Sequence, residues 1–130
     1  MEQVQGLNHV ALRCSDLGRL EAFYGEVLGL RVLRRWPAAE GGLDRSVWLS
    51  TGQGFLALER ASRPVEEEPF EDAPAGWQVV ALTIGRADRG AWEGRLLAAG
   101  VRLARRTPFS LFFRDPEGNR VALTHWPEEA

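Results

Sequence analysis

The sequence predicts an α+β fold built from two β-α-β-β-β modules, and three observations support this prediction. The segment His9–Leu12 (HVAL) is matched about seventy residues later by Val79–Leu82 (VVAL). A second set of matches follows at nearly the same spacing, with Gly29, Arg31, Arg34 and Arg35 matched by Gly100, Arg102, Arg105 and Arg106. Segments with strand and helix periodicity also follow in the same order in both halves. Two diverged copies of one supersecondary unit account for all three.

The first module is expected to begin with a strand over residues 7–14, whose side chains alternate between two faces. Ser15 or Asp16 is placed to cap a helix, and the apolar residues that follow recur at helical spacing. These residues are Leu17, Leu20, Phe23, Tyr24, Val27 and Leu28. Gly29 stands where a left-handed residue commonly ends a helix. Three strands complete the module, at about 30–36, 44–50 and 54–60.

A polar, proline-rich connector over 61–77 leads to the second module, which repeats the order of the first. A strand is expected at about 78–84, and a helix at about 87–99 that ends at Gly100. The last three strands are expected near 101–106, 109–114 and 119–125. Asp115–Asn119 is a strong turn signal before the last of them. The chain is therefore expected to be a single domain over 1–130, with modules at about 6–60 and 78–126.

Composition excludes several classes of function. The chain has 130 residues, 45% of them hydrophobic and 26% charged, as is usual for a globular domain. A net charge of -2 gives no basic field for nucleic acid, and no apolar run is long enough for a membrane helix. The N-terminus lacks the features of a signal peptide, and Cys14 is the only cysteine, so a cytoplasmic location is expected. All 16 basic residues are arginine, which excludes lysine Schiff-base chemistry and a lysine-dependent phosphate loop.

Four motifs carry a resemblance to a known family. They are Leu7–Leu12 (LNHVAL), Ser15–Leu17 leading to Ala22–Tyr24, Val27–Leu30 (VLGL) and Phe112–Asn119 (FFRDPEGN). In this order the chain resembles the vicinal oxygen chelate superfamily, which groups glyoxalase I, extradiol dioxygenases and bleomycin- and fosfomycin-resistance proteins. The resemblance implies a curled mixed sheet around a cleft and a homodimer. It also implies a divalent metal, held by the first and last strands of each module, that polarises the oxygens of a substrate.

The expected ligand positions do not carry the expected ligands. The first position falls on His9, but the others fall on Val79, Ala57 and Ala122, which have alkyl side chains. Because a catalytic divalent site usually needs about three protein ligands, the sequence predicts neither a metal nor another cofactor. One alternative stays open, in which a shift of two residues makes Glu59 a ligand together with His9. In the other two interpretations, His9 is a polar group in the cleft or a satisfied, partly buried histidine.

Strand alternation gives a provisional lining for the cleft, with small residues leaving space between aromatic walls and charged anchors. The residues expected to bind a ligand are His9, Arg13, Trp48, Phe55, Glu59, Phe112, Arg120 and Thr124. A salt bridge of Arg13 or Arg120 with Glu59 is the structural alternative for the two arginines. Trp36 and the 61–77 connector are expected to form a lid or a dimer contact.

The sequence favours binding of a small, partly aromatic molecule without a metal, as in the bleomycin-resistance branch. The alternative is a metal-dependent lyase, isomerase or dioxygenase that uses His9 and Glu59, so the sequence does not decide whether the protein is an enzyme. A third possibility is a degenerate domain kept for its dimer surface. The expected partners are a small-molecule ligand and a second copy of the chain, with no nucleic acid and no membrane.

Overall fold

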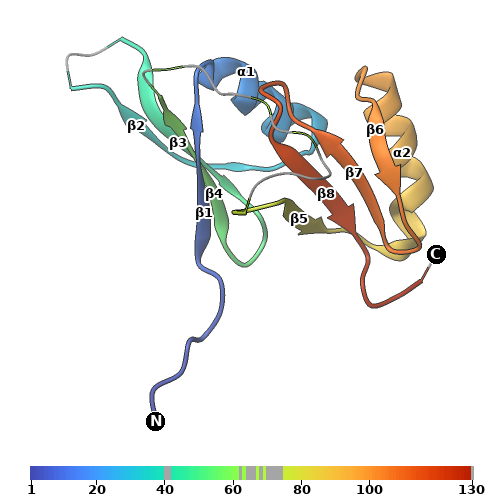
Figure 1. The fold of residues 1–130 in the computed structure, drawn as a ribbon. Coiled ribbons are helices and arrows are strands. Elements are labelled where there is room, and N and C mark those ends of the chain that lie inside the picture. The colour runs from blue at the N-terminus through green and yellow to red at the C-terminus, as the bar shows by residue number, and fades with distance from the viewer. Residues whose placement is uncertain (40–41, 62, 64–66, 68, 70–74, 130) are drawn as a thin grey trace. The chain divides into compact units, whose positions relative to one another are not determined.

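The computed structural model describes residues 1–39, 42–61, 63, 67, 69 and 75–129 (Figure 1). The chain divides into two compact units, which we call unit 1 (Met1–Pro64) and unit 2 (Val65–Ala130). Each unit contains one four-stranded mixed sheet and one main helix, so the predicted α+β class and the repeated β-α-β-β-β order are confirmed. None of the described helices is long and apolar enough to cross a membrane.

Unit 1 begins with an extended segment and continues into strand β1 (His9–Cys14), as Figure 1 shows. Helix α1 (Leu17–Ala22) follows and continues as a π-helical turn, η1 (Phe23–Val27). Strands β2 (Val32–Pro37), β3 (Asp44–Ser50) and β4 (Phe55–Arg60) complete the unit. The sheet order is β1-β4-β3-β2, in which β1 and β4 run parallel and the other pairs antiparallel.

Unit 2 has the same topology. Strand β5 (Val80–Thr83) leads through a 3₁₀ turn, η2 (Arg86–Asp88), into helix α2 (Arg89–Ala98). Strands β6 (Leu103–Arg106), β7 (Ser110–Arg114) and β8 (Arg120–Thr124) follow. The sheet order is β5-β8-β7-β6, again with one parallel pair, between β5 and β8.

Several predicted ends of elements are confirmed. The Asp16 side chain accepts a hydrogen bond from the backbone N–H of Arg19, at 3.1 Å, and caps α1. Gly29 and Gly100 have φ of 77° and 80°, the left-handed conformation expected after a helix. In the predicted turn, Asp115 Oδ1 accepts hydrogen bonds from the backbone N–H groups of Glu117, at 2.9 Å, and Asn119, at 3.0 Å.

The last turn of the first helix differs from the uniform α-helix that the apolar spacing predicts. The backbone N–H of Leu28 donates to the carbonyl of Phe23, five residues earlier, at 3.1 Å. A π-helical turn is wider than an α-helical turn, so side chains five residues apart point more nearly toward the same side of the helix than they would in an α-helix. Phe23 and Leu28 are both buried, at 7% and 5% exposure, which an α-helical turn would not favour.

Each sheet has one face that its own helix covers, which we call the helix face, and an opposite open face. In unit 1 the helix face carries Cys14 and the buried residues Val47, Leu49, Leu56 and Leu58. In unit 2 it carries Leu111, Phe113, Val121 and Leu123. The Cys14 thiol packs in the core, because Cys14 is fully buried.

The same ion pair ties the helix to the sheet in both units. In unit 1, Arg35 donates to the two carboxylate oxygens of Glu21 on α1, at 2.8 and 2.5 Å, and also to Asp44, at 3.1 Å. Glu21 first and then Asp44 raise the pKa of Arg35 above its usual range, since both carboxylates favour the charged guanidinium. In unit 2, Arg106 donates to Glu93 on α2. Arg35 and Arg106, which the repeat matches in the sequence, therefore have the same structural role, since each binds a glutamate of the helix in its own unit.

Candidate functional site

The open face of unit 1 carries four rings in series, one from each strand of the sheet. His9 on β1 and Phe55 on β4 are register partners, and their rings stack with centroids 4.6 Å apart and planes within 7°. Phe55 stacks in turn on Trp48 of β3, at 4.5 Å and 24°. Trp48 meets Trp36 of β2 edge to face, at 5.3 Å. We call His9, Phe55, Trp48 and Trp36 the ring series.

The register explains why these rings meet. Side chains of alternate residues share one face of a sheet, and strands lie about 4.8 Å apart, which is close to the spacing of stacked rings. Ala57 pairs with Ala11 on one side and with Trp48 on the other. Two alanines therefore lie beside the rings on the open face, where larger side chains would crowd them.

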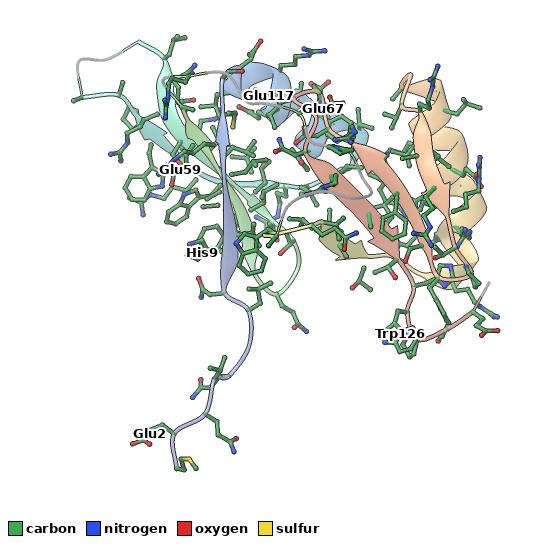
Figure 2. All side chains as sticks on the ribbon, in the orientation of Figure 1. Glu2, His9, Glu59, Glu67, Glu117 and Trp126 are labelled. Carbon is green, nitrogen blue, oxygen red and sulfur yellow. The ribbon has the colours of Figure 1, made fainter. Side chains whose placement is uncertain are left out.

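Polar groups border the ring series on the same face. Arg13 pairs with Glu59 across β1 and β4, and Glu59 pairs with Ser46 across β4 and β3. The predicted salt bridge between Arg13 and Glu59 does not form among the described residues. Figure 2 shows His9 near the start of β1 and Glu59 farther along the sheet. The two ends of this face therefore differ. One end carries the imidazole of His9, and the other carries Arg13 and Glu59, two residues of opposite charge.

His9 is exposed, and its Nδ1 lies 2.8 Å from the side-chain oxygen of Asn8. Because that oxygen only accepts, Nδ1 is the donor, and in the neutral ring Nε2 keeps its lone pair. The ring is thus held by a hydrogen bond and by its stack on Phe55. This arrangement agrees with the interpretation of His9 as a polar group of the open face.

The residues at the four expected ligand positions do not fit a divalent metal. Register places Ala57 beside Ala11 and Ala122 beside Ala81, so the two alanines have equivalent positions on the last strands of the two units. The register partner of Glu59 is Arg13, four residues beyond His9, which is about 13 Å along a strand. Among the described residues, no group of three histidine, cysteine, aspartate or glutamate side chains could hold a metal ion.

The other predicted site residues lie in unit 2. Phe112 pairs with Ala122 on the open face and is half-buried. The hydroxyl of Thr124 accepts a hydrogen bond from Ser110, at 2.9 Å, and donates to the carbonyl of Phe109, at 3.3 Å. Arg120 donates to the carbonyls of Pro69 and Trp77, at 3.0 and 2.9 Å. Its contacts within unit 2 thus hold described parts of the connector, of which residues 62, 64–66, 68 and 70–74 lie outside the described residues.

His125 points to the helix face, as its strand parity predicts. It is buried at 4% exposure, and its Nε2 accepts a hydrogen bond from Arg89 of α2, at 3.0 Å. Its Nδ1 donates to the carbonyl of Glu128. His125 therefore joins the start of α2 to the C-terminal segment and takes no part in the open face.

Sequence reasoning missed the role of Trp36 and of Arg34. Trp36 was expected as a lid or dimer contact, and the sequence did not show that within unit 1 it also belongs to the ring series. Arg34 served only as a marker of the repeat, yet its guanidinium carbon lies 3.8 Å from the centroid of the Trp36 ring. Strand parity could have found both, because residues 34 and 36 share the face on which Arg34 pairs with Trp48.

Comparison with known proteins agrees with this fold. The chain is 28% identical over 123 residues to glutathione transferase FosA from Serratia marcescens, covering 92% of this chain and 80% of that protein. The crystal structure of lactoylglutathione lyase from Agrobacterium tumefaciens has a TM-score of 0.72 at 24% identity, covering 98% of this chain and all of that one (100%). A FosX mutant from Listeria monocytogenes, in complex with Mn(II) and a dihydroxypropylphosphonic acid, has a TM-score of 0.74 at 17% identity, with coverage of 94% and 93%.

The two crystal structures share less than a quarter of their residues with this chain, so they show the fold alone. The sequence profile of one family matches residues 6–123, which is nearly the whole chain. On that match, the chain belongs to the Glyoxalase/Bleomycin resistance protein/Dioxygenase superfamily.

Proposed function

We propose that the open face of unit 1 binds a small, partly aromatic molecule, and that it does so without a divalent metal. The observation that carries this proposal is the ring series, in which four strands each contribute one ring to a continuous row. Small-molecule sites typically combine flat apolar contact with a few polar groups that fix orientation. Here the flat contact is the ring series, and the polar groups are His9, Arg13 and Glu59.

The geometry supports contact with a planar group in particular. The first three rings are stacked on one another, so a planar group of the ligand can lie against the row or extend it at its exposed end, which is His9. Offset-stacked aromatic pairs contribute about 0.5–1.5 kcal/mol beyond the burial of their area. Nε2 of His9 offers a hydrogen-bond acceptor beside that position.

Binding without a metal rests on the chemistry of the side chains. Three of the four expected ligand positions carry alkyl groups, which have no lone pair to donate. Metal chemistry does occur on this fold, since the FosX mutant holds Mn(II). The metal-dependent alternative with His9 and Glu59 is therefore the outcome against which the proposal is tested.

A homodimer remains part of the proposal, on the resemblance to the family. A row of aromatic side chains can also form an interface between two copies of a chain, because such rings supply much of the energy of protein interfaces. The test must therefore separate ligand binding from association.

The test is a binding screen on protein dialysed against EDTA, with isothermal titration for each aromatic compound that binds. Trp48→Ala removes the central indole of the ring series and is expected to weaken binding at least tenfold. Trp126→Ala is the matched control, because Trp126 is 67% exposed and lies in unit 2, outside both the ring series and the connector, and this variant should bind as the wild type does. Light scattering on each variant gives the oligomeric state.

Two outcomes contradict the proposal. Binding or turnover that requires added nickel, zinc, manganese or ferrous iron, and that His9→Ala and Glu59→Ala each abolish, would establish the metal-dependent alternative. A Trp48→Ala variant that binds ligand normally but dissociates into monomers would make the ring series an interface between copies.

A further inference from the structure

Arg34 and Arg35 are adjacent in the sequence but face opposite sides of the sheet. Arg35 lies on the helix face and binds two carboxylates, those of Glu21 and Asp44. Arg34 lies on the open face, opposite Trp48 in the register, and its guanidinium carbon stands 3.8 Å from the centroid of the Trp36 ring. A guanidinium over an indole face is held by the ring quadrupole, so its position is partly fixed before any ligand binds.

Three hydrogen-bond donors at this corner of the open face have no acceptor among the residues that the structure describes. Among the described residues, Arg34 makes no hydrogen bond and no ion pair. Trp36 Nε1 and Ser46 Oγ are both buried and also without a hydrogen-bond partner in that part of the chain. Ser46 is only 3% exposed, and it pairs with Trp36 across β2 and β3. The three groups therefore belong to one corner, which we call the donor corner.

The chemistry of these groups selects the ligand. A guanidinium and an indole N–H only donate hydrogen bonds, and a serine hydroxyl can donate. A ligand that satisfies them must bring acceptor oxygens. Glu59, the other register partner of Ser46, carries a negative charge, but Arg13 beside it offsets that charge. A carboxylate matches best, because its two oxygens fit the planar fork of a guanidinium.

We propose that the donor corner binds the carboxylate of an aromatic acid whose ring lies against the ring series. This inference rests on the proposed function. Trp36 links the two surfaces, because it belongs both to the ring series and to the donor corner. Arg34 is exposed and makes the first contact. Trp36 Nε1 and Ser46 Oγ are closed to solvent, so a carboxylate oxygen reaches them only by displacing the side chains that cover them.

The test is isothermal titration of the full-length protein with three probes. These are 2-naphthoate, its neutral counterpart 2-naphthamide, and cyclohexanecarboxylate, which keeps the charge without the aromatic ring. The wild type is expected to bind 2-naphthoate at least tenfold more tightly than either of the other two. Arg34→Gln should reduce the affinity for 2-naphthoate at least tenfold and leave that for 2-naphthamide unchanged, while Arg34→Lys should retain part of the affinity.

Arg45→Gln is the matched control, since Arg45 is an exposed arginine of the neighbouring strand β3 and belongs to neither the ring series nor the donor corner. It removes the same charge and should bind 2-naphthoate as the wild type does. In a ¹H–¹⁵N spectrum, 2-naphthoate should shift the indole N–H signal that Trp36→Phe removes. That shift separates a contact at the donor corner from a general effect of charge.

The outcomes separate this inference from the proposed function. Equal binding of 2-naphthoate and 2-naphthamide, unaffected by Arg34→Gln, would overturn the donor corner and leave the ring series as the binding surface. An equal loss in Arg34→Gln and Arg45→Gln would reduce the effect to net charge and also overturn it. If Trp48→Ala does not weaken any aromatic ligand that the screen finds, the proposed function itself fails.

Discussion

In unit 1, Ser46 and Glu59 are register partners on the open face, and the Ser46 hydroxyl is buried without a hydrogen bond among the described residues. In unit 2 the equivalent partners are Ser110 and Thr124, and the Ser110 hydroxyl donates to Thr124 at 2.9 Å. The two units also differ two residues farther along each strand, at the next register pair on the same face. Trp48 opposite Ala57 takes part in the ring series, whereas the equivalent Phe112 opposite Ala122 has no such row beside it within the described part of unit 2.

The helix faces show the opposite trend. Both units keep a buried apolar layer, a left-handed glycine after the helix, and an arginine that binds a glutamate of the helix. The two copies thus agree where folding requires agreement and differ on the open face. The open face of unit 1, with a row of rings and donors that are unpaired among the described residues, is therefore where we place the proposed binding surface.

The largest expected effect comes from breaking the shared apolar layer. Phe113→Ala removes a fully buried ring from the helix face of unit 2 and should lower the free energy of unfolding by about 3–5 kcal/mol. Phe112→Ala removes the same side chain from the open face, where it is half-buried, and should cost clearly less. Urea unfolding followed by circular dichroism measures both. Equal losses would show that the two faces of this sheet are packed alike.

A smaller effect, with opposite signs in the two units, is expected at the equivalent serines. Ser110→Ala removes the donor to Thr124 and should destabilise the protein by about 1 kcal/mol. Ser46→Ala removes a buried hydroxyl that has no partner in the described part of the chain, so it should be neutral or stabilising by up to about 1 kcal/mol. Thermal unfolding of the two variants beside the wild type decides the sign. A clear loss in Ser46→Ala would mean that its hydroxyl is already satisfied in the free protein.

The smallest effects are expected for the repeated ion pair. Arg35→Gln and Arg106→Gln should each lower the free energy of unfolding by about 0.2–1 kcal/mol, since these side chains are 46% and 61% exposed and water screens the charges. Arg35 binds two carboxylates and should show the larger loss. Both losses should shrink in about 1 M NaCl. A loss that salt does not change would point to packing of the arginine stems.

The sequence was a good guide to the fold because the repeat fixes the order of the elements twice. It placed Asp16, Gly29 and Gly100 at helix ends, which depend on local backbone chemistry. It was less exact at strand ends, and the first strand begins at His9 where the alternation predicted residue 7. It also missed the π-helical turn, because that turn depends on which side chains the sheet can bury.

For the site, sequence alternation put His9, Phe55 and Trp48 on one face, since that requires only the two-residue period of a strand. It could not show that Trp36 continues the row, that Arg34 lies over Trp36, or that the Ser46 hydroxyl has no partner among the described residues. Those facts depend on the pairing of β2 with β3 and β3 with β4, between residues distant along the chain. The sequence by itself determined the repeat and the α+β class, because these follow from residue identity and spacing. Only the tertiary structure decided which polar groups are paired and which are not, because pairing depends on register and on side-chain positions across strands.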